Sequence, residues 1–295
     1  WQVFRDRVLL AAGLATALIG IMLWASHVRG RRADLSAQAL TVVLDNIEEA
    51  VRVEVSRLLE GVYRAVGETR RLADVLEAQL AAADVQGRGN LLAELVPLRE
   101  AMGQKPQAFM LALRLFRDRP GDEALRGDLE RLGADTGSFE ELAGAYHDEL
   151  ERNAHPELAV GLWRSLAQLY AERLGSPEQA AKALEEVLRL EPQDARVVEQ
   201  LGRLYRRLNA LPDLARIYRK QVALETRPSA RRNLLYELAT LCEERLGDGA
   251  AAVEAYRQIL TQEPSDSTAM AAVHRLLVAA ERWDDLAQHM EREAQ

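Results

Sequence analysis

The sequence predicts an all-α protein in which one apolar N-terminal helix precedes a long array of helical hairpins. Three observations favour this fold class. Residues 8–26 form an uncharged apolar run, and a pattern of apolar positions with helical spacing recurs after a step of 72 residues, from Trp163 to Leu235. No stretch shows the strict alternation of apolar and polar residues that is typical of a half-buried strand. Aromatic residues make up only 5% of the chain, as expected of a helix-rich composition.

The run 8–26 is flanked by arginines on both sides. Its nineteen residues, at ~1.5 Å each, span about 28 Å, which is close to the hydrocarbon thickness of a bilayer. Trp24 and His27 lie near one end, where amphipathic rings favour the membrane interface. A buried helix of a soluble core and a cleaved signal peptide fit less well, because the other helices are amphipathic and no A-x-A site follows. We therefore expect residues 1–32 to form a membrane anchor with its flanks, the run 8–26 being a single transmembrane helix.

The arginines around this run predict its orientation. Three follow it, Arg29, Arg31 and Arg32, against two arginines and an aspartate before it. The positive-inside rule favours a single-pass protein of the bacterial inner membrane whose repeat array lies in the cytoplasm rather than the periplasm. The single cysteine, Cys242, cannot form an internal disulfide, which is compatible with this compartment.

Segment 33–67 is predicted to be a juxtamembrane helix, since it contains no proline. Its apolar residues follow one another at steps of three or four, close to a heptad seam. They are Leu40, Leu44, Ile47, Val51, Val55, Leu58, Val62 and Ala65. One interpretation is a coiled coil that joins two copies of the chain through residues 40–65. The interpretation that we favour is a helix that packs on the first repeat and caps its open end.

The clearest repeat unit is a hairpin of two helices between Trp163 and Pro192. The first helix has an apolar face made of Trp163, Leu166, Ala167 and Tyr170. The second has an apolar face made of Ala180, Ala183, Leu184, Val187 and Leu188. Between them Gly175 suits a left-handed turn, Ser176 an N-cap and Pro177 a first helical position. One hairpin cannot bury both faces, so it needs neighbours.

Copies of this hairpin supply the neighbours. A step forward of 72 residues places Leu235, Leu238, Ala239 and Cys242 on the first apolar face. The same step carries Pro192 onto Pro264, and a step back carries it onto Pro120. No insertion or deletion is needed, which indicates a true internal repeat and therefore a stack of hairpins.

The motif Trp163-x2-Leu166-Ala167-x2-Tyr170, followed by Ala180-x3-Leu184 and Pro192, resembles the tetratricopeptide repeat (TPR) pattern W-x2-L-G-x2-Y…A-x3-F…P. A second set lies between the copies and consists of Val198, Leu201, Gly202, Tyr205, Leu214 and Tyr218. Each 72-residue step therefore resembles two TPR hairpins. The resemblance covers residues 68–295 and is clear from about 139. It implies a right-handed α-solenoid over 68–295 that binds other proteins.

Helices within this array are expected between glycines and prolines. Gly87, Gly89 and Gly133 are among the glycines expected to separate them. The expected helices are 68–84, 90–102, 106–117, 123–133, 138–151, 157–174, 177–190, 195–208, 211–225, 229–246, 249–262, 266–279 and 282–293.

In tetratricopeptide arrays the first helix of each hairpin lines a concave groove, and the resemblance implies which residues face it here. They are Arg164, Gln168 and Glu172, then Arg196, Glu199, Arg203, Arg206 and Arg207, then Asn233, Tyr236, Thr240, Glu243 and Glu244. The middle helix would form a basic strip between acidic or neutral ones. Guanidinium groups fork onto carboxylates, so this strip predicts a partner with an acidic segment or a chain-terminal carboxylate. The alternative is a solvated face balanced by neighbouring glutamates.

The remaining composition excludes several classes of function. Because 5 of the 38 basic and 1 of the 46 acidic residues precede residue 33, the rest carries 33 against 45, a net charge of −12. That field disfavours nucleic-acid binding. The sequence contains no phosphate-binding glycine loop, no H-E-x-x-H, no cysteine pair and no G-x-S-x-G, so we predict no catalytic residue and no cofactor. His147 and His155 lie eight residues apart, and we expect no metal site there.

We therefore predict a non-enzymatic, membrane-anchored scaffold or adaptor that binds partner proteins in its groove. One alternative is a permanent structural subunit of a large envelope or motility complex. A second is the C-terminal part of a larger signalling enzyme, such as a kinase, whose catalytic domain lies upstream.

Overall fold

The computed structural model describes residues 49–153 and 155–293, and every regular element within these ranges is helical. The predicted all-α class is thus confirmed for this part of the chain. The chain divides into two compact units between Ala145 and Tyr146. The apolar run 8–26 and residues 33–48 lie outside the described residues. Within the described ranges, none of the helices is both long enough and apolar enough to cross a bilayer.

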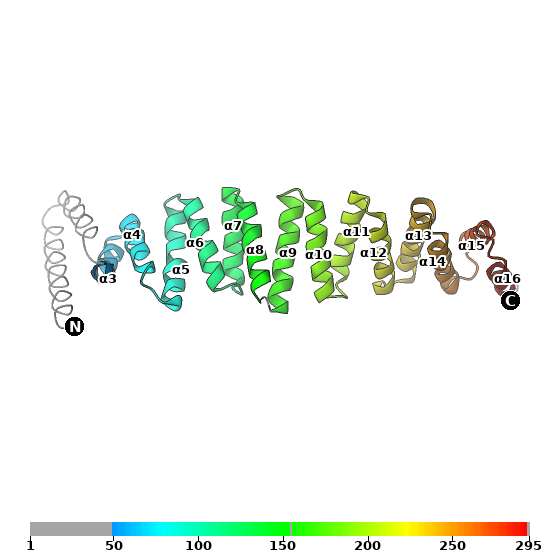
Figure 1. Ribbon diagram of the computed structural model, residues 1–295, viewed down its shortest axis with the longest axis horizontal. Helices are drawn as coiled ribbons and strands as arrows, with labels where there is room; N and C mark the ends of the chain where they lie inside the picture. The colour runs from blue at the N-terminus through cyan, green and yellow to red at the C-terminus, as the bar shows by residue number, and fades with distance from the viewer. Residues whose placement is uncertain (1–48, 154, 294–295) are drawn as a thin grey trace. The chain divides into compact units, whose positions relative to one another are not determined.

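The first unit is a succession of helices, in which each helix from α3 to α6 packs against the next (Figure 1). They are α3 (Glu49–Val66), α4 (Thr69–Leu80), α5 (Val85–Ala101), α6 (Lys105–Asp118), α7 (Glu123–Thr136) and the start of α8 (Phe139–Asn153). The largest fully buried side chains of this unit are Phe109 and Phe116 of α6, a helix that packs against both α5 and α7. Burial of these apolar faces is the main driving force that holds the helices together.

The second unit contains the end of α8 and the repeats that the sequence shows most clearly. Its further helices are α9 (Pro156–Glu172), α10 (Pro177–Leu190), α11 (Ala195–Leu208), α12 (Leu211–Leu224), α13 (Pro228–Thr240) with the π-helix η1 (Leu241–Leu246), α14 (Gly249–Gln262), α15 (Ser267–Ala279) and α16 (Trp283–Glu293). From α9 onward each helix packs against the next. The unit is therefore a stack of hairpins, as the 72-residue repeat predicts.

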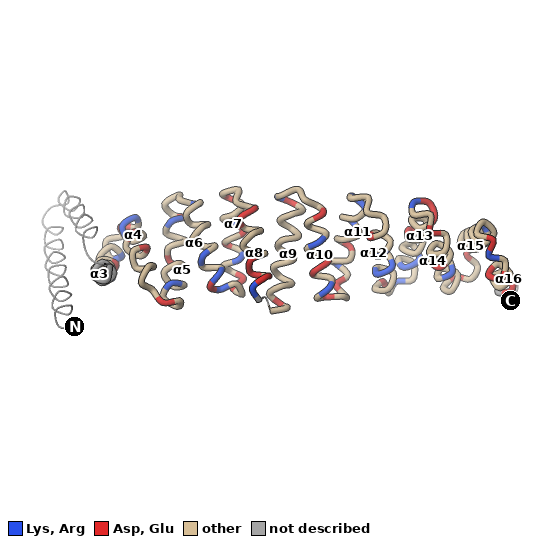
Figure 2. The backbone as a smooth tube through the Cα atoms, in the orientation of Figure 1, with Lys and Arg blue, Asp and Glu red and all other residues tan. Residues whose placement is uncertain are grey.

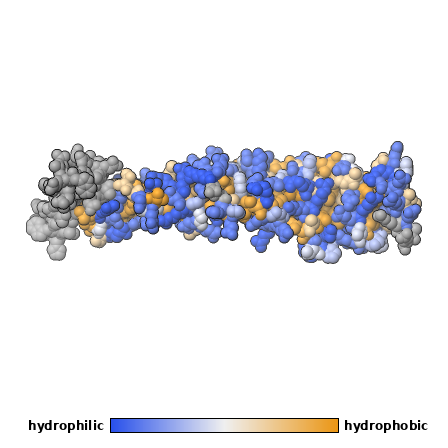
Figure 3. All heavy atoms as spheres, turned by 60° about the horizontal axis from the view of Figure 1, so that its bottom comes forward, coloured by the Kyte–Doolittle hydropathy of each residue, from blue (hydrophilic) through white to orange (hydrophobic). Residues whose placement is uncertain are grey.

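The predicted apolar faces are the buried faces of these helices. Leu166 and Ala167 of α9 are buried, and Trp163 and Tyr170 are half-buried at the edges of the same face. All five predicted residues of α10 are buried, and so are Leu235, Leu238, Ala239 and Cys242 one step later. One face of the molecule shows mostly hydrophilic side chains with smaller hydrophobic areas between them (Figure 3).

Aspartates spaced by the repeat cap the helices. Asp194 accepts hydrogen bonds from the backbone N–H groups of Arg196 (2.9 Å) and Val197 (3.2 Å) at the start of α11. Asp122 and Asp266, one step back and one step forward, cap α7 and α15 in the same way. Each carboxylate satisfies amide groups that lack a partner within the helix.

The turn after α9 has the predicted residues but not the predicted capping bond. Gly175 has φ +59°, in the left-handed region that glycine adopts without a steric penalty. Ser176 stands at the N-cap of α10, but its hydroxyl donates to Leu174 O (3.2 Å) and makes no capping bond. Ser176 therefore stands at the predicted N-cap position without making a capping hydrogen bond, and Pro177 begins α10 as expected.

The helix predicted over 229–246 ends in a wide turn. In η1 the carbonyl of Cys242 accepts from Asp248 N at 2.8 Å. In the preceding copy the carbonyl of Tyr170 accepts from Ser176 N at the same distance. These bonds satisfy the last carbonyl groups of both first helices, so the wide turn belongs to the repeat.

The glycines at 87, 89 and 133, which the sequence predicts to separate helices, lie inside helices α5 and α7. Helix α5 starts at Val85 instead of residue 90, because the carboxylate of Asp84 accepts from Gly87 N (2.7 Å) and starts the helix earlier. Gly133 lies inside α7, where a methyl group in place of its hydrogen would meet Phe109 at 3.3 Å. This glycine allows close packing and does not end the helix.

Helix α3 packs against α4 through Val55, Leu59 and Tyr63. Of the other seam residues whose side chains are described, Leu58 is 40% exposed, Val62 is half-buried and Ala65 is exposed. The face that is buried against α4 is therefore turned away from most of the predicted seam.

Candidate functional site

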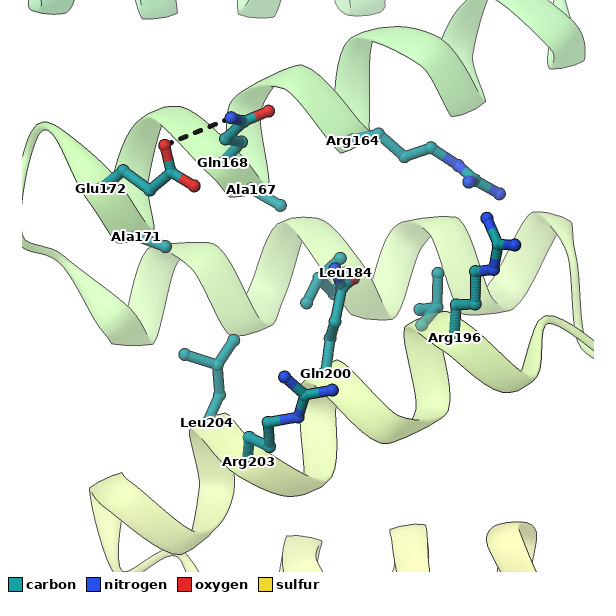
Figure 4. A pocket seen from close by; sticks show the side chains of 11 residues that line it. Arg164, Ala167, Gln168, Ala171, Glu172, Leu184, Arg196, Gln200, Arg203 and Leu204 are labelled. Carbon is teal, nitrogen blue, oxygen red and sulfur yellow. Dashed lines mark hydrogen bonds between the residues drawn. The ribbon is translucent and has the colours of Figure 1, made fainter.

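The first helices of three successive hairpins, α9, α11 and α13, line three hollows in the second unit. The first hollow has a volume of about 570 Å³ and lies between α9 and α11, with Leu184 of α10 at its base (Figure 4). It is lined by Arg164, Ala167, Gln168, Ala171, Glu172, Leu184, Arg196, Val197, Gln200, Arg203 and Leu204. Five of these are residues that the sequence places in the groove: Arg164, Gln168, Glu172, Arg196 and Arg203.

On the α9 side of this hollow the polar groups are paired. The guanidinium of Arg164 donates to the carboxylates of Glu191 and Asp194, the latter at 2.6 Å. Gln168 Nε2 donates to Glu172 Oε2 at 3.2 Å. The charge of Arg164 is therefore balanced within the protein.

On the α11 side the arginines are less constrained. Arg203 donates to Glu199 at 2.7 Å, but the two side chains are 66% and 62% exposed. Such exposed pairs contribute only about 0–1 kcal/mol. The Arg196 side chain has no ion-pair partner among the described residues, and it points toward Arg164 (Figure 4). The hollow thus contains one uncompensated guanidinium and one that can exchange its partner.

Two further hollows lie between α11 and α13. One of about 540 Å³ is lined by Glu199 and Asn233, and one of about 670 Å³ by Arg206, Tyr236, Thr240 and Glu244. Glu237 lines both and was not predicted. Together with the first hollow, they bring eleven of the thirteen predicted groove residues onto the lining of three neighbouring cavities.

Arg206 bridges two helices at the third hollow. Its guanidinium donates to the hydroxyl of Tyr218 and to Glu237 (3.1 Å), and lies 5.8 Å from the centroid of the Tyr218 ring. The hydrogen bond to Tyr218 raises the pKa of Arg206, and burial raises the pKa of Tyr218. This arginine stabilises the wall of the hollow and is not a free cation.

Tyr236 is hydrogen-bonded to the next hairpin. Its hydroxyl donates to Asp266 Oδ1 at 2.6 Å. Burial and this bond raise the pKa of Tyr236 to about 12, and the bond lowers the pKa of Asp266. The phenol is held neutral at physiological pH.

Two predicted residues lie outside the three hollows. Arg207 does not line any of them, and Glu243 accepts from Arg275 and from the hydroxyl of Tyr256. The structure adds Gln200 to the first hollow, one helical turn from Arg196, and helical spacing alone identifies that position.

The predicted basic strip is largely balanced by acidic neighbours. Among its members, Arg203 pairs with Glu199 and Arg206 with Glu237. Basic and acidic residues are interspersed along the helices of each unit (Figure 2). The alternative interpretation of a face balanced by glutamates therefore describes part of the strip. Arg196 and Arg207 have no ion-pair partner among the described residues, and of these two only Arg196 lines one of the three hollows.

The described residues contain no group of three or more His, Cys, Asp or Glu side chains placed to hold a metal ion. His147 Nε2 lies 3.0 Å from the hydroxyl of Tyr170, and its ring meets the Trp163 ring edge-on at 5.6 Å between centroids. Cys242 is fully buried, and burial raises the pKa of its thiol. These residues belong to the packing of the repeat.

Comparison with known proteins supports the repeat. Residues 160–204 match the family model described as tetratricopeptide repeat. No curated protein matches the chain.

Several solved structures are similar to it. They include pilF of Pseudomonas aeruginosa (14% identity, 77% of this chain and 97% of that one, TM-score 0.34), a tetratricopeptide repeat protein from Parabacteroides merdae (15%, 82% and 92%, 0.33) and MamA from Desulfovibrio magneticus RS-1 (18%, 63% and 98%, 0.33). At these identities and TM-scores we draw no inference about function from them.

Proposed function

We propose that this chain, in which residues 160–204 match the tetratricopeptide repeat, is a non-catalytic scaffold that binds an acidic segment of a partner protein between α9 and α11. The observation that carries the proposal is the 570 Å³ hollow with Arg196 and Arg203 on one wall. A carboxylate placed there would gain charge-assisted bonds from Arg196 and Arg203, and amide donors from Gln168 and Gln200. The flat apolar base at Leu184 would accept the backbone or a short side chain.

The proposal includes a membrane anchor at residues 8–26. Its support is the uncharged run of nineteen residues between arginine-containing flanks. In this proposal the protein crosses the bacterial inner membrane once, and the array lies in the cytoplasm because more arginines follow the span than precede it.

The groove is tested with charge reversal on the full chain. Arg196→Glu combined with Arg203→Glu reverses both cations of the α11 wall. Arg207→Glu combined with Arg219→Glu changes the net charge equally, at residues that line none of the three hollows. Each tagged variant is purified from membranes in mild detergent, and co-purifying proteins are quantified by mass spectrometry.

We expect a partner that accompanies the wild type and the control variant and falls at least fivefold with the groove variant. The same set of proteins in all three samples would contradict the proposal. A stoichiometric partner that none of the variants removes would instead indicate a permanent structural subunit.

The anchor is tested separately by washing membranes with alkaline carbonate. The wild-type chain should stay in the membrane pellet. Leu14→Arg with Leu18→Arg should move it to the supernatant, because two charges at the centre of the span cost several kcal/mol, about 2.5–3.5 each. A wild-type chain that is released by the wash would refute the anchor. Digestion of the array by protease in intact spheroplasts would place it on the periplasmic side.

A further inference from the structure

Helix α11 separates its charges between two hollows. Arg196, Gln200 and Arg203 line the hollow toward α9, whereas Glu199 lines the hollow toward α13. The ion pair between Arg203 and Glu199 (2.7 Å) therefore lies on the solvent-exposed side of α11, with one member lining each hollow. Both members of this pair are more than half exposed, so water can replace either partner at small cost.

The 540 Å³ hollow between α11 and α13 suits a basic side chain. Its polar groups include the carboxylates of Glu199, Glu225 and Glu237. Glu199 and Glu237 are paired with Arg203 and Arg206, whose side chains are 66% and 62% exposed. Glu225 is held by Arg227, which lines the same hollow, so Glu199 and Glu237 are the carboxylates available to a cation. Val198, Leu224 and Leu234 supply an apolar surface for the methylene stem of a lysine or arginine.

We propose that the partner segment carries both charges, with an acidic residue in the α9–α11 hollow and a basic residue in the α11–α13 hollow. This inference rests on the proposed function and specifies the chemistry of its ligand. The acidic residue takes Arg203 away from Glu199, and the released Glu199 binds the basic residue. One exposed intramolecular pair is exchanged for two intermolecular pairs, so the two contacts support each other.

The geometry also sets the spacing of the two residues. The hollows lie on either side of one helix, and an α-helix with its side chains is about 10–12 Å across. An extended chain advances about 3.3 Å per residue. The acidic and basic residues of the ligand should therefore be about three positions apart.

Three fluorescent peptides with the same serine–glycine background test this inference. The first carries two adjacent glutamates, the second adds a lysine three positions after them, and the third places that lysine eight positions away. Binding to the detergent-purified full chain is measured by fluorescence anisotropy at low salt. We expect the second peptide to bind about two- to fivefold more tightly than the other two, as one additional exposed ion pair allows.

Glu199→Gln gives the decisive comparison. It should tighten the first peptide, because Arg203 is released, and leave the second nearly unchanged, because the loss of the lysine's partner offsets the same release. The preference for the second peptide should therefore disappear. Glu186→Gln removes a carboxylate from an exposed pair with Arg189 on α10 and should leave both affinities unchanged.

The outcomes separate this inference from the proposed function. Equal binding of the three peptides to the wild type, or a preference for the second peptide over the first that persists in Glu199→Gln, would overturn the two-charge ligand and leave the acidic groove in place. If no peptide binds the wild type, the acidic groove and this inference both fail.

Discussion

Arg164 of α9 donates to Asp194 across 2.6 Å, and the same carboxylate caps α11. One repeat step later, Tyr236 and Asp266 occupy the equivalent positions and make the equivalent contact, also at 2.6 Å. In both copies a polar side chain from the first helix of one hairpin is bound to the N-cap of the next. The groove wall is therefore fixed at the point where successive hairpins meet.

Asp194→Ala should lower the free energy of unfolding by about 1–3 kcal/mol. The N-cap contributes about 0.5–2 kcal/mol and the partly exposed pair with Arg164 up to about 1. Asp194→Asn keeps the capping oxygen and should be much less destabilised. Arg164→Gln, which removes the pairs with Asp194 and Glu191 but keeps the cap, should also be less destabilised than Asp194→Ala. Thermal unfolding followed by circular dichroism measures the three variants. An Asp194→Asn variant as unstable as Asp194→Ala would show that the charge, and not the cap, is decisive.

Alkaline pH should loosen the junction of α13 and α15. The pKa of Tyr236 is raised to about 12 in the folded state, against about 10 for an unperturbed tyrosine. A raised pKa stabilises the fold fully below the unfolded value, so this contribution is lost as the pH rises from about 10 through 12. Absorbance at 295 nm should show one phenol fewer titrating near pH 12 in Tyr236→Phe than in the wild type. A difference centred near pH 10 would contradict the contact.

Acid should act on the other partner of this contact. The hydroxyl of Tyr236 lowers the pKa of Asp266, so the carboxylate stabilises the fold above its unfolded pKa of about 3.9. That contribution is lost as the pH falls through the lowered folded value. Tyr236→Phe should therefore reduce the difference in melting temperature between pH 7 and pH 3. An unchanged difference would show that the bond does not affect the acid titration.

Leu59→Ala should destabilise the first unit much more than Leu58→Ala. Leu59 is fully buried against α4, and Leu→Ala at such sites costs about 2–5 kcal/mol, whereas Leu58 is 40% exposed and its replacement should cost less than about 1. Chemical denaturation measures the stability, and light scattering measures the mass of the particle. Halving of that mass by Leu58→Ala would favour the coiled coil over the capping helix.

Gly202→Ala should be tolerated and Gly202→Leu should not. A methyl group at Gly202 would lie 3.1 Å from Gln221 Nε2, at the flexible end of a side chain that can move, and 3.6 Å from Ile217. The alanine also improves helix propensity by about 0.5–1 kcal/mol. Leucine would overpack the crossing of α11 and α12 at a cost of about 1–3 kcal/mol. Melting temperatures in the order Ala, Gly, Leu, from high to low, are the expected result.

Helix positions in the second unit could be predicted well because local signals mark their ends. Helices 177–190, 195–208 and 249–262 have the predicted bounds, and each starts beside a proline, an aspartate or a glycine. Gly87 and Gly133 misled the prediction, since a capping carboxylate from Asp84 and a close contact with Phe109 decide their conformation. Phe109 is far from Gly133 in the sequence, so the local pattern could not show their contact. Asp84 is close to Gly87 in the sequence, but its capping bond competes with the tendency of glycine to break a helix.

The groove could be predicted as a set of positions but not as a set of charges. The resemblance to tetratricopeptide arrays placed Arg164, Arg196 and Arg203 in one groove, and all three line the first hollow. It could not show that Arg164 is neutralised by Asp194 while Arg196 is not, because that depends on how hairpins about 30 residues apart are stacked. A 30-residue spacing between an arginine and a capping aspartate is a signal that would have identified this pair.

The burial of Cys242 has a practical consequence. The chain's only thiol is fully buried in η1, which packs against α12 and α14, and burial raises its pKa, so the thiol stays protonated at neutral pH. Maleimide reagents react with exposed thiolates, so the native protein should resist alkylation. A cysteine introduced at Gln200 or Asn233 would then be the single labelled position, and probes at these two positions can report occupancy of neighbouring hollows without removal of any native residue from the core.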